Sequence, residues 1–438
     1  MGVGVPLRLG HERCPRSPLA LRRPGFDGQD HCMTILGPGD IVGLVNSTYA
    51  ADLFVTVVAE FDIFTRLAQR DATTAQQLSE LLEIDERAAD VTLTYLAALG
   101  LLERLPDGAV RVTEPAEQYL RAGSSIDLRH YVRTVSTRQG CRQASQVLRT
   151  GQPASWEGDG GDWLDRMSEN DFADSFSAAM NARGTYLGPA LGEVLRDLGR
   201  SPAPEIQPTG DNRQAAPAED PHTPVVHTPE VVHSAHDTTP VDHPPSVGWQ
   251  AGSPPGVVGD GVTGEITGSV RKILDIGGSS GIYACSLVQA LPGTSAAVLD
   301  LPSVVDFTRE SIAARGLSDR VDVIAGDMFG DLPQGFDLHL YSNVWHDWDA
   351  QSIGKLAAAS FAALPPGGVI VDHDMHLDDA KSGPLRQAEF SVRMMLMTVG
   401  KCYSTPELAR ILGPIGFEDI HLRPTTAGYS VVVARKPA

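Results

Sequence analysis

The sequence predicts an α/β protein, with a parallel sheet covered by helices on both faces in its C-terminal part and a smaller helical domain before it. Three observations predict this architecture. From Val270 onward, short and almost wholly apolar segments alternate with segments of helical periodicity, as buried parallel strands and their connecting helices do. A loop rich in glycine, Gly277–Gly281, joins the first of these strands to a helix. Further upstream, two short helical segments precede a pair of strands separated by a Pro-Asp-Gly turn at 106–108.

The length, net charge and cysteine spacing of the chain exclude some classes of function. The chain has 438 residues, which is long for one domain, and its 42% of hydrophobic residues suffice for real cores. The formal net charge of −20 disfavours nucleic acid and anionic membranes as partners. No apolar run approaches the length of a membrane span. The scattered cysteines lack C-x-x-C spacing, which favours reduced thiols in the cytoplasm over a disulfide framework or a zinc site: Cys14, Cys32, Cys141, Cys285 and Cys402.

Composition divides the chain into five segments. Residues 1–38 lack periodicity and are expected to be disordered, or to lie upstream of a natural start at Met33. A Pro-, His- and Gly-rich insertion at 201–265 carries too few apolar side chains to offset the entropy lost on ordering, and it is also expected to be disordered. The segments left to fold are a winged-helix-like domain at 39–122, a helical connector at 123–200 and the α/β domain at 266–438.

The N-terminal domain contains a helix–helix–hairpin pattern. Thr73 or Thr74 can cap a first short helix, and Asp85 can cap a second, Glu86–Leu99. The hairpin strands, 101–105 and 109–113, follow. In DNA-binding proteins of this pattern the second helix is basic and enters the major groove, but here acidic residues stand near its start, which favours another role. Three longer segments have helical spacing: Gly39–Arg66, Leu128–Arg149 and Trp163–Leu198.

The stretch Lys272–Gly281, with the sequence KILDIGGSSG, is a strand that runs into a tight glycine loop and then a helix. Glycines let the backbone turn sharply and let a ligand approach closely, and a helix N-terminus presents free N–H groups to polar ligand atoms. Such a loop at the end of a parallel strand indicates a nucleotide-type cofactor site. A glycine pair can also be a plain strand-to-helix turn, so the loop needs support from other motifs.

Three further motifs supply that support. Asp300 ends the next strand in VLD, where a carboxylate can accept hydrogen bonds from ribose hydroxyls. GDMF, residues 326–329, follows a third strand, Val321–Ala325. SNVWHDWD, residues 342–349, follows a fourth strand, Phe336–Tyr341, and places His346 at the same edge of the sheet.

In this order and spacing, LDIGGSSG, VLDLP, GDMF and VWHDWD resemble the S-adenosylmethionine-dependent small-molecule O-methyltransferases, both the plant caffeate and hydroxyindole type and the actinomycete antibiotic-tailoring type. The resemblance covers roughly 39–198 and 270–437 and is most specific in the later part. It implies a class I methyltransferase sheet, Rossmann-like, with seven strands of which the last is antiparallel. It also implies that 39–122 is a dimerisation domain and that the protein is a homodimer acting on a small-molecule hydroxyl acceptor in secondary metabolism.

The resemblance assigns the cofactor contacts. The loop glycines Gly277, Gly278 and Gly281 would lie against the methionine part of S-adenosylmethionine, and Asp275 would hold its ammonium group directly or through water. The remaining carboxylates, Asp300 and Asp327, would bind the ribose hydroxyls and the adenine amino group, with Met328 against the ring. Taken alone, each of these carboxylates could instead be a helix N-cap or a solvated loop end with no role in cofactor binding.

His346 is the candidate general base, because it follows a parallel strand at its C-terminal end and its ordinary pKa lies near neutral pH. It matches the catalytic histidine of the family. Asp347 could orient it, or only cap the next helix. In the plant enzymes of this family, a glutamate orients the catalytic histidine, and its position corresponds to Cys402 here. A second glutamate of the family corresponds to a position near His373. His373 could be oriented by either neighbouring aspartate or could itself meet the acceptor.

By resemblance, Met180 and Asn181 lie on a helix that lines the acceptor pocket, and Met394 and Met397 follow Arg393 on another. Methionines suit irregular aromatic ligands, but a core stripe explains them equally well.

Other functions stay open at this point. Asp372, Asp374 and His376 alternate along one face, which permits a metal site as in magnesium-dependent catechol methyltransferases, although the resembled family uses no metal. Methylation of carbon or nitrogen needs the same cofactor. A nicotinamide oxidoreductase is disfavoured because the loop is not G-x-G-x-x-G. The non-enzyme alternative is a winged-helix regulator with a metabolite-binding domain.

Overall fold

The computed structural model describes residues 36–154, 170–197 and 270–438. The chain divides into two units, Met1–Gly37 and Pro38–Ala438, and only the second is considered below. Most of the N-terminal extension expected at 1–38, and the whole insertion expected at 201–265, lie outside the described residues.

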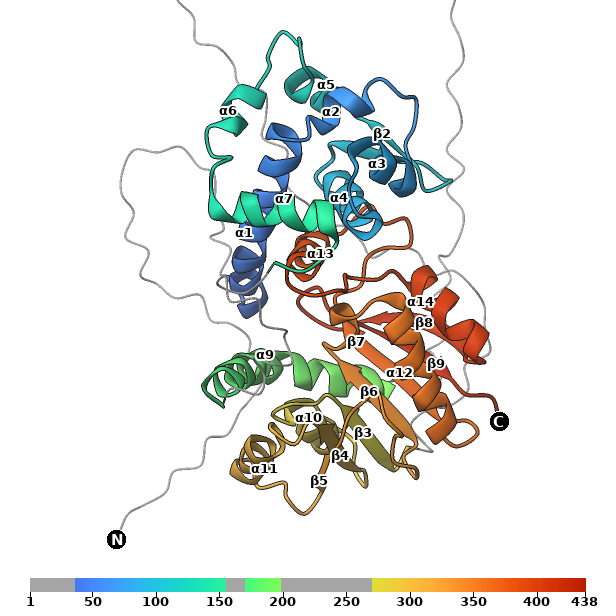
Figure 1. Ribbon diagram of the computed structural model, residues 1–438. Coiled ribbons are helices and arrows are strands. Elements are labelled where there is room, and N and C mark those ends of the chain that lie inside the picture. Colours follow the sequence, from blue (N-terminus) through green and yellow to red (C-terminus); the bar gives the residue numbers. More distant parts are fainter. Residues whose placement is uncertain (1–35, 155–169, 198–269) are drawn as a thin grey trace, which may run out of the picture. The chain divides into compact units, whose positions relative to one another are not determined.

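The C-terminal part folds around a mixed sheet that has seven strands in the described residues, in the order β5-β4-β3-β6-β7-β9-β8 (Figure 1). The first five in this order pair in parallel, and β9 is antiparallel to both β7 and β8. The predicted parallel sheet, with an antiparallel last strand, is therefore confirmed. The strands are β3 (Lys272–Ile276), β4 (Ser295–Asp300), β5 (Val321–Ala325), β6 (Leu338–Ser342), β7 (Val369–Asp374), β8 (Glu418–Pro424) and β9 (Ser430–Arg435).

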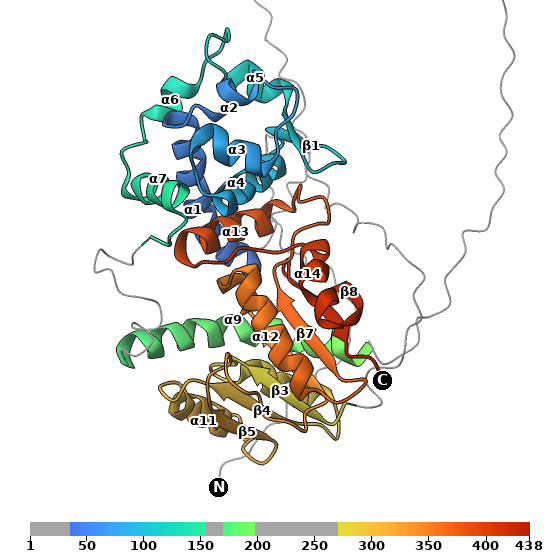
Figure 2. The same cartoon turned by 45° about the vertical axis from the view of Figure 1, so that its right-hand side comes forward.

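Helices cover both faces of this sheet (Figure 2). Successive side chains of β3 point to opposite faces, so that Ile273 joins one apolar core and Leu274 the other. The core of Ile273 includes side chains of α10 (Ile282–Ala290), α11 (Val305–Ala314) and α9 (Asn170–Asp197). The core of Leu274 includes side chains of α12 (Ala350–Ala363) and α14 (Thr405–Leu412).

Helix α9 approaches α10 closely because small residues line the contact. Gly184, Gly188 and Gly192 recur every fourth residue on one face of α9, and a Cβ added to them would overlap, in turn, Ile282, Ser286 and Ala290 of α10. The stripe fixes the long helix against the helix that follows the glycine loop, and it brings the start of α9 over that loop.

The N-terminal part contains the expected helix–helix–hairpin. Thr74 caps α3 (Ala75–Leu82) in a capping box with Gln77, and Asp85 caps α4 (Glu86–Ala98). The antiparallel pair β1 (Leu102–Arg104) and β2 (Val110–Val112) follows, and then α5 (Glu114–Leu120).

Two long helices expected from periodicity are each interrupted. The segment 39–66 forms α1 (Pro38–Ala59) and α2 (Ile63–Leu67), because Asp62 adopts a left-handed φ of 49° between them. The segment 128–149 forms α6 (Arg129–Arg133) and α7 (Gln139–Thr150). There, the hydroxyls of Thr134 and Ser136 donate to carbonyls three residues back and compete with helix formation.

Helix α13 (Leu385–Met397) connects the two parts, because this C-terminal helix packs against both α1 and α4 (Figure 1). From α4, Arg87 donates hydrogen bonds to the carbonyls of Thr398 and Gly400 just beyond α13. Asp90, also on α4, pairs with Lys381 and Lys401, which both pair with Glu407 of α14. Helix α4 is thus buried against the α/β part, where a DNA-reading helix would be free.

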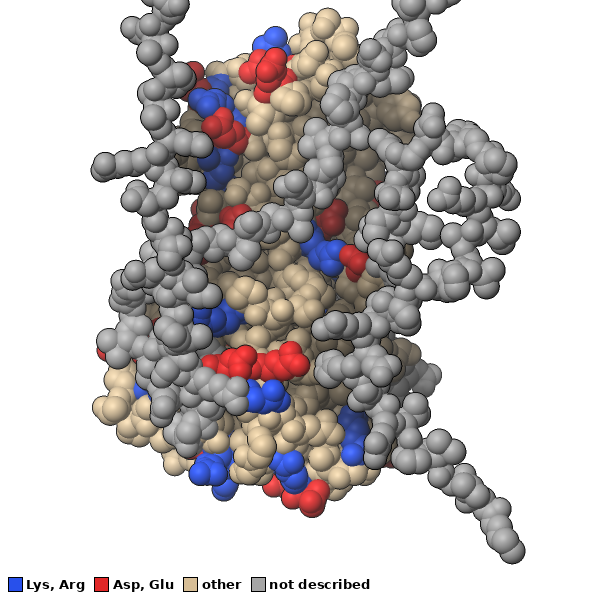
Figure 3. All heavy atoms as spheres, turned by 180° about the vertical axis from the view of Figure 1, so that it is seen from behind, with Lys and Arg blue, Asp and Glu red and all other residues tan. Residues whose placement is uncertain are grey.

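On the face shown in Figure 3, acidic and basic side chains of the described residues are interspersed among uncharged ones. This visible face carries no continuous basic surface of the kind that nucleic-acid binding requires.

The expectation that no apolar run approaches a membrane span was too strong. Helix α1 has 22 residues and a mean hydropathy of 1.6 in its most apolar window, so it could cross a membrane by length and composition. In the structure it packs against α13, α7 and α6, and its second half supplies buried residues such as Leu53 and Val57. In its first half, three large apolar side chains are at least half exposed: Ile41, Leu44 and Val45.

Candidate active site

The sequence motifs converge at one edge of the sheet. The parallel register aligns Ile276 with Leu299, Asp300 with Ala325, and Ser342 with His373. The glycine loop, the loops after β4, β5 and β6, and the end of β7 therefore emerge side by side, at the edge where open α/β sheets bind ligands. The strand ends that carry Asp275, Asp300 and His346 therefore lie at one edge of the sheet.

Asp275 lies beneath the glycine loop with no exposed surface. Its Oδ2 accepts a hydrogen bond from the backbone N–H of Ala284 at 3.1 Å, while its Oδ1 is buried without a partner. Burial raises the pKa of Asp275 to about 7. A buried acceptor without a donor indicates that this loop is built to receive a further hydrogen-bonding group.

The loop glycines serve the loop's own packing. Gly277 and Gly281 have φ values of 70° and 68°, in the left-handed region that disfavours side chains. A Cβ on Gly278 would come within 2.6 Å of the Asp275 carboxyl carbon. These glycines let the loop close tightly over Asp275.

Asp300 holds the glycine loop from the end of β4. One carboxylate oxygen accepts the N–H of Ser279 at 2.7 Å, and the other accepts the N–H of Leu301 at 2.8 Å. Burial raises the pKa of Asp300, although these two N–H groups oppose the shift. The hydroxyl of Ser279 also lies 3.2 Å from that of Ser177, so α9 reaches the same loop.

The loop after β5 carries the third predicted carboxylate. Asp327 is exposed, and its Oδ1 accepts the N–H of Phe329 at 2.9 Å, which tightens the turn. Met328 is half-buried and packs against the core of Leu274. The ring of Phe329 meets Trp348 edge-on with centroids 4.7 Å apart, which gives this loop an aromatic wall.

His346 stands in a short 3-10 turn, Trp345–Asp347, directly after β6, and is buried. Its Nδ1 lies 2.8 and 2.7 Å from the two carboxylate oxygens of Asp374 at the end of the neighbouring strand β7. Burial lowers the pKa of His346, but Asp374 and Asp347 outweigh burial and raise it above its ordinary value. Burial likewise raises the pKa of Asp374, and His346 outweighs it and holds that carboxyl well below its usual range.

The partner of His346 is therefore Asp374. From the sequence, Asp374 had been considered as a partner of His373, or as part of a metal site with Asp372 and His376. Asp347 is only half-buried, and its Oδ1 lies 3.6 Å from Nε2 of His346, beyond a hydrogen bond. Nor does Asp347 cap the next helix, because Asp349 accepts the N–H of Ser352 in that role. Cys402 is fully buried, and Asp374 supplies from β7 the carboxylate that this thiol lacks.

His373 was expected to be oriented by one of the aspartates next to it in the sequence, and this expectation was wrong. Neither neighbouring aspartate contacts it, because side chains alternate along β7 and point the aspartates to the other face. Its Nδ1 lies 2.9 Å from the Ser342 hydroxyl, and its ring contacts Tyr283 and Tyr429. Burial lowers the pKa of His373 to about 3. It is fully buried and neutral, as a packing histidine is.

Asp372 and Asp374, near the end of β7, belong to two separate His–Asp pairs. His376 Nε2 lies 2.9 Å from Asp372, while Asp374 is committed to His346. Within the described ranges, no group of three or more His, Cys, Asp or Glu side chains is arranged to hold a metal ion.

On the acceptor side, the predicted residues of α9 and α13 are dispersed. The Met180 sulfur accepts a hydrogen bond from Arg183, and the side-chain Oδ1 of Asn181 accepts one from Arg315, which follows α11. Met394 is buried in the core that contains Ile273, and Met397 packs against it, so both behave as core residues.

Sequence reasoning missed a polar group that joins α10 to the last hairpin. Asn343 follows β6 with a φ of 59°, donates to the Tyr283 hydroxyl at 3.1 Å and accepts from the Tyr429 hydroxyl at 2.9 Å. The available signal was an asparagine directly after a strand, a residue type that tolerates the left-handed conformation.

Comparisons with known proteins agree with this geometry. Residues 264–418 match the family model of the O-methyltransferase domain. A 3-hydroxy-5-methyl-1-naphthoate 3-O-methyltransferase from Streptomyces sahachiroi is 28% identical over 386 residues, which are 87% of this chain and 90% of that enzyme. An acetylserotonin O-methyltransferase from Bos taurus is 34% identical over 164 residues, which are 37% of this chain and only 47% of that enzyme.

Among solved structures, an O-methyltransferase family 2 protein from Planctomyces limnophilus, in complex with apigenin, superposes with a TM-score of 0.67. It is 23% identical, and the match covers 92% of this chain and 98% of that one. The chain shares the fold of that methyltransferase. Residues 264–418 of the chain are similar to the O-methyltransferase domain.

Proposed function

We propose that this enzyme transfers the methyl group of S-adenosylmethionine to a hydroxyl of an aromatic or polyketide-like small molecule, with His346 as general base. The observation that carries the proposal is the buried His346–Asp374 pair at the same sheet edge as the glycine loop. The name of the Streptomyces sahachiroi relative, a hydroxynaphthoate O-methyltransferase, supports an aromatic acceptor.

The residues of the glycine loop fit the cofactor. S-adenosylmethionine, when bound, supplies a methyl group that its sulfonium charge already activates. The unpartnered Oδ1 of Asp275 would accept from the ammonium group, and Asp300, whose oxygens each retain a free lone pair, would accept from the ribose. Asp327 and Met328 would meet the adenine, and the backbone of Gly277, Gly278 and Gly281 would lie along the methionine part.

His346 would prepare the acceptor. An ionised Asp374 on Nδ1 fixes the proton on that nitrogen, which leaves Nε2 with a lone pair to take a proton from a hydroxyl. Asp374 also stabilises the imidazolium that forms. A base so placed contributes about 10²–10⁴-fold to the rate. Exclusion of water at this buried position strengthens the effect of both charges.

The test is a transfer assay with methyl-labelled S-adenosylmethionine and a panel of hydroxynaphthalenes and hydroxyanthraquinones. We expect labelled ether from the wild type and a fall of about 10²–10⁴-fold in His346→Gln. The matched control is His376→Gln, which breaks the second buried His–Asp pair of this region and should lose stability but retain most turnover. Equal activity of the two variants, or label on carbon or nitrogen, would contradict the proposal.

We propose further that the protein is a homodimer formed through the N-terminal part, in which α3, α4 and the β1–β2 hairpin make a winged-helix-like unit. The support is the exposed apolar face at the start of α1, where the side chains of Ile41, Leu44 and Val45 are 57%, 60% and 50% exposed. Sedimentation should give a dimer for the wild type and a monomer for Ile41→Asp/Leu44→Asp. A monomeric wild type would contradict the proposal.

We place the enzyme in the cytoplasm. The described cysteines, Cys141, Cys285 and Cys402, are buried free thiols, as expected of a reducing compartment. Labelling of the protein in fractionated cells tests this, and recovery with the membrane fraction would contradict it.

A further inference from the structure

Arg87 of α4 ties three backbone segments together. Its Nη1 donates to the carbonyls of Thr398 and Gly400 at 3.0 and 2.7 Å, and its Nη2 donates to the carbonyl of Gly151 at 2.7 Å. Gly151 follows α7, and Thr398 and Gly400 belong to the turn 398–400 that follows α13. Hydrogen bonds donated by a guanidinium are charge-assisted, and their loss would leave the carbonyl of the buried Gly400 without this donor.

The turn 398–400 lies directly against the turn that carries His346. A Cβ added to Gly400 would overlap the carbonyl oxygen of His346 and come within 2.5 Å of the backbone nitrogen of Trp348. The two backbones are therefore in contact at a place where only a glycine fits. Next to this contact, the hydroxyl of Tyr403 donates to the carbonyl of Trp348 at 2.7 Å.

The turn that carries His346 depends on such neighbours. It is a short 3-10 turn, Trp345–Asp347, and turns of this kind have poor hydrogen-bond geometry of their own. Asp374 of β7 lies within hydrogen-bond distance of Nδ1 of His346, and Phe390 of α13 meets the imidazole edge-on with ring centroids 5.0 Å apart. The imidazole is thus held by the sheet and by α13, and Arg87 holds the turn at the end of α13.

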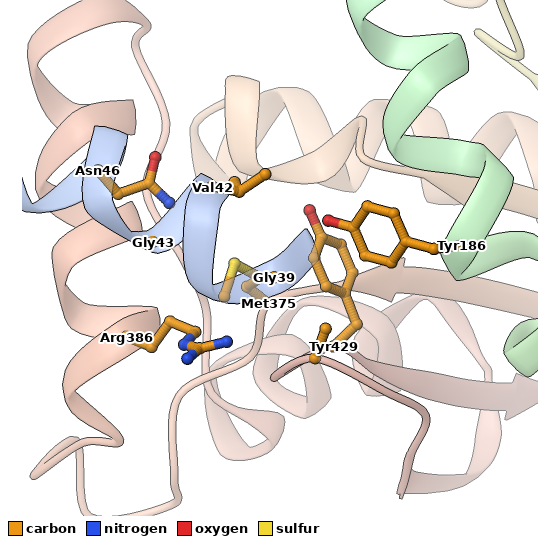
Figure 4. Close-up of a pocket in the computed structure, with 9 residues that line it drawn as sticks. Gly39, Val42, Gly43, Asn46, Tyr186, Met375, Arg386 and Tyr429 are labelled. Carbon is orange, nitrogen blue, oxygen red and sulfur yellow. The ribbon is translucent and has the colours of Figure 1, made fainter. Parts of the chain in front are cut away.

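Arg87 is separate from the pocket shown in Figure 4. That pocket is lined by residues of α1, α9, α13 and the last hairpin, and by Met375, which directly follows Asp374 at the end of β7. Among the described residues that line it, neither Arg87 nor any residue of the turn 398–400 occurs. The contacts of Arg87 therefore point to support of the base and not to binding of a ligand in this pocket.

We propose that Arg87 is a positioning residue for His346, because it holds the turn 398–400 against the turn that carries the base. Since Arg87 belongs to α4, the placement of the imidazole then depends on how the N-terminal part packs against the α/β part. A misplacement of about 1 Å at the reacting atoms can cost about 10²-fold in rate. The inference rests on the proposed function, in which His346 takes the proton of the acceptor hydroxyl.

The experiment compares Arg87→Met with Arg104→Met. Arg104 of β1 is the matched control, because it is another half-buried arginine that joins the two parts, through a hydrogen bond to the carbonyl of Lys381 at 3.0 Å. Lys381 belongs to neither of the two turns. We expect Arg87→Met to lower kcat for methyl transfer by about 10²-fold and to leave the KM and Kd for S-adenosylmethionine unchanged. Arg104→Met should keep the wild-type kcat even where it lowers stability.

Two further variants test the path from Arg87 to the base. In Gly400→Ala the added methyl would push against the carbonyl of His346 while Arg87 stays in place, so kcat should fall again. If both changes act on one turn, the double variant should lose less than the product of the two single losses. Arg87→Lys retains the charge and part of the hydrogen bonding, so it should recover part of kcat, and it carries the test if Arg87→Met does not fold.

The magnetic resonance spectrum of the histidines gives a readout that needs no turnover. In protein with isotope-labelled histidine, the imidazole signals of His346 are identified by their absence from His346→Gln. They should shift in Arg87→Met and keep their wild-type positions in Arg104→Met, because only the first variant releases the turn 398–400.

The inference is overturned if Arg87→Met keeps the wild-type kcat, if it loses no more than Arg104→Met, or if its loss lies in KM alone. Losses that multiply in the double variant also overturn it, because Arg87 and Gly400 would then act independently. A wild type that transfers no methyl group, or an active His346→Gln, is a failure of the proposed function instead. The histidine spectrum then decides alone: unshifted His346 signals in Arg87→Met overturn the positioning role, and a shift confined to this variant upholds it.

Discussion

His346 and Asp374 come from the ends of neighbouring strands, and Nδ1 of the imidazole lies 2.8 and 2.7 Å from the two carboxylate oxygens. The register that aligns Ser342 with His373 brings the two residues together, four and one positions further on. Both are buried, so each fixes the protonation of the other. If His346 is the general base, as we propose, this relationship sets its strength and the pH range in which it works.

Asp374→Asn should lower kcat by roughly 10²–10⁴-fold, because the amide neither fixes the tautomer nor stabilises the imidazolium. A general base works when deprotonated, so activity rises with pH through the pKa of His346. Since Asp374 raises that pKa above the ordinary value of 6.5, the wild-type midpoint should lie above 6.5 and the variant midpoint below that of the wild type. The measurement is the pH dependence of kcat. An unshifted midpoint would show that Asp374 does not act on the base.

Asp300→Asn should weaken S-adenosylmethionine binding by about 10- to 100-fold. The amide keeps one acceptor oxygen, whereas the carboxylate accepts the N–H groups of Ser279 and Leu301 with two. Calorimetric titration measures the loss. The control is Asp306→Asn on α11, whose exposed side chain pairs with Arg309 and which should leave the affinity as it is. Equal affinities of the two variants would remove Asp300 from the cofactor site.

Gly188→Ala should destabilise the fold by about 1–3 kcal/mol, because the added methyl would overlap the Ser286 side chain and force α9 away from α10. Denaturant unfolding gives the change in free energy. Thr185→Ala, on the exposed side of the same helix, should change it by no more than about 0.5 kcal/mol. A neutral Gly188→Ala would mean that the two helices are not closely packed.

Asp90→Asn should lower the free energy of unfolding by about 3 kcal/mol, because it leaves Lys381 and Lys401 with Glu407 alone in a mostly buried cluster. Burial raises the pKa of Asp90, but the two lysines outweigh it and hold the pKa well below its usual range. Glu103→Gln breaks an exposed ion pair with Arg111 and should cost at most about 1 kcal/mol. A similar cost for both variants would contradict a clamp between α4 and the α/β part.

The parallel sheet and the edge where its motifs meet could be predicted because they depend on local patterns. Apolar runs followed by glycine or aspartate mark strand ends, and parallel strands end at one edge. Periodicity alone overestimated helix length, because α1 ends at Ala59 and the left-handed Asp62 starts a separate helix, α2. The close contact of α9 with α10 also has a sequence signal, since glycines recur at every fourth residue from Gly184.

The partners inside the site could not be predicted, because they come from residues distant in sequence. Asp374 meets His346 across two strands, and the choice between Asp374 and Asp347 depends on which face of β7 each side chain occupies.

The most direct test of the central claim is calorimetric titration of the wild-type protein with S-adenosylmethionine. A cofactor site built from Asp275, the glycine loop and Asp300 predicts saturable binding at one site per chain with a Kd in the micromolar range. No binding by a folded protein would contradict the methyltransferase assignment of this site.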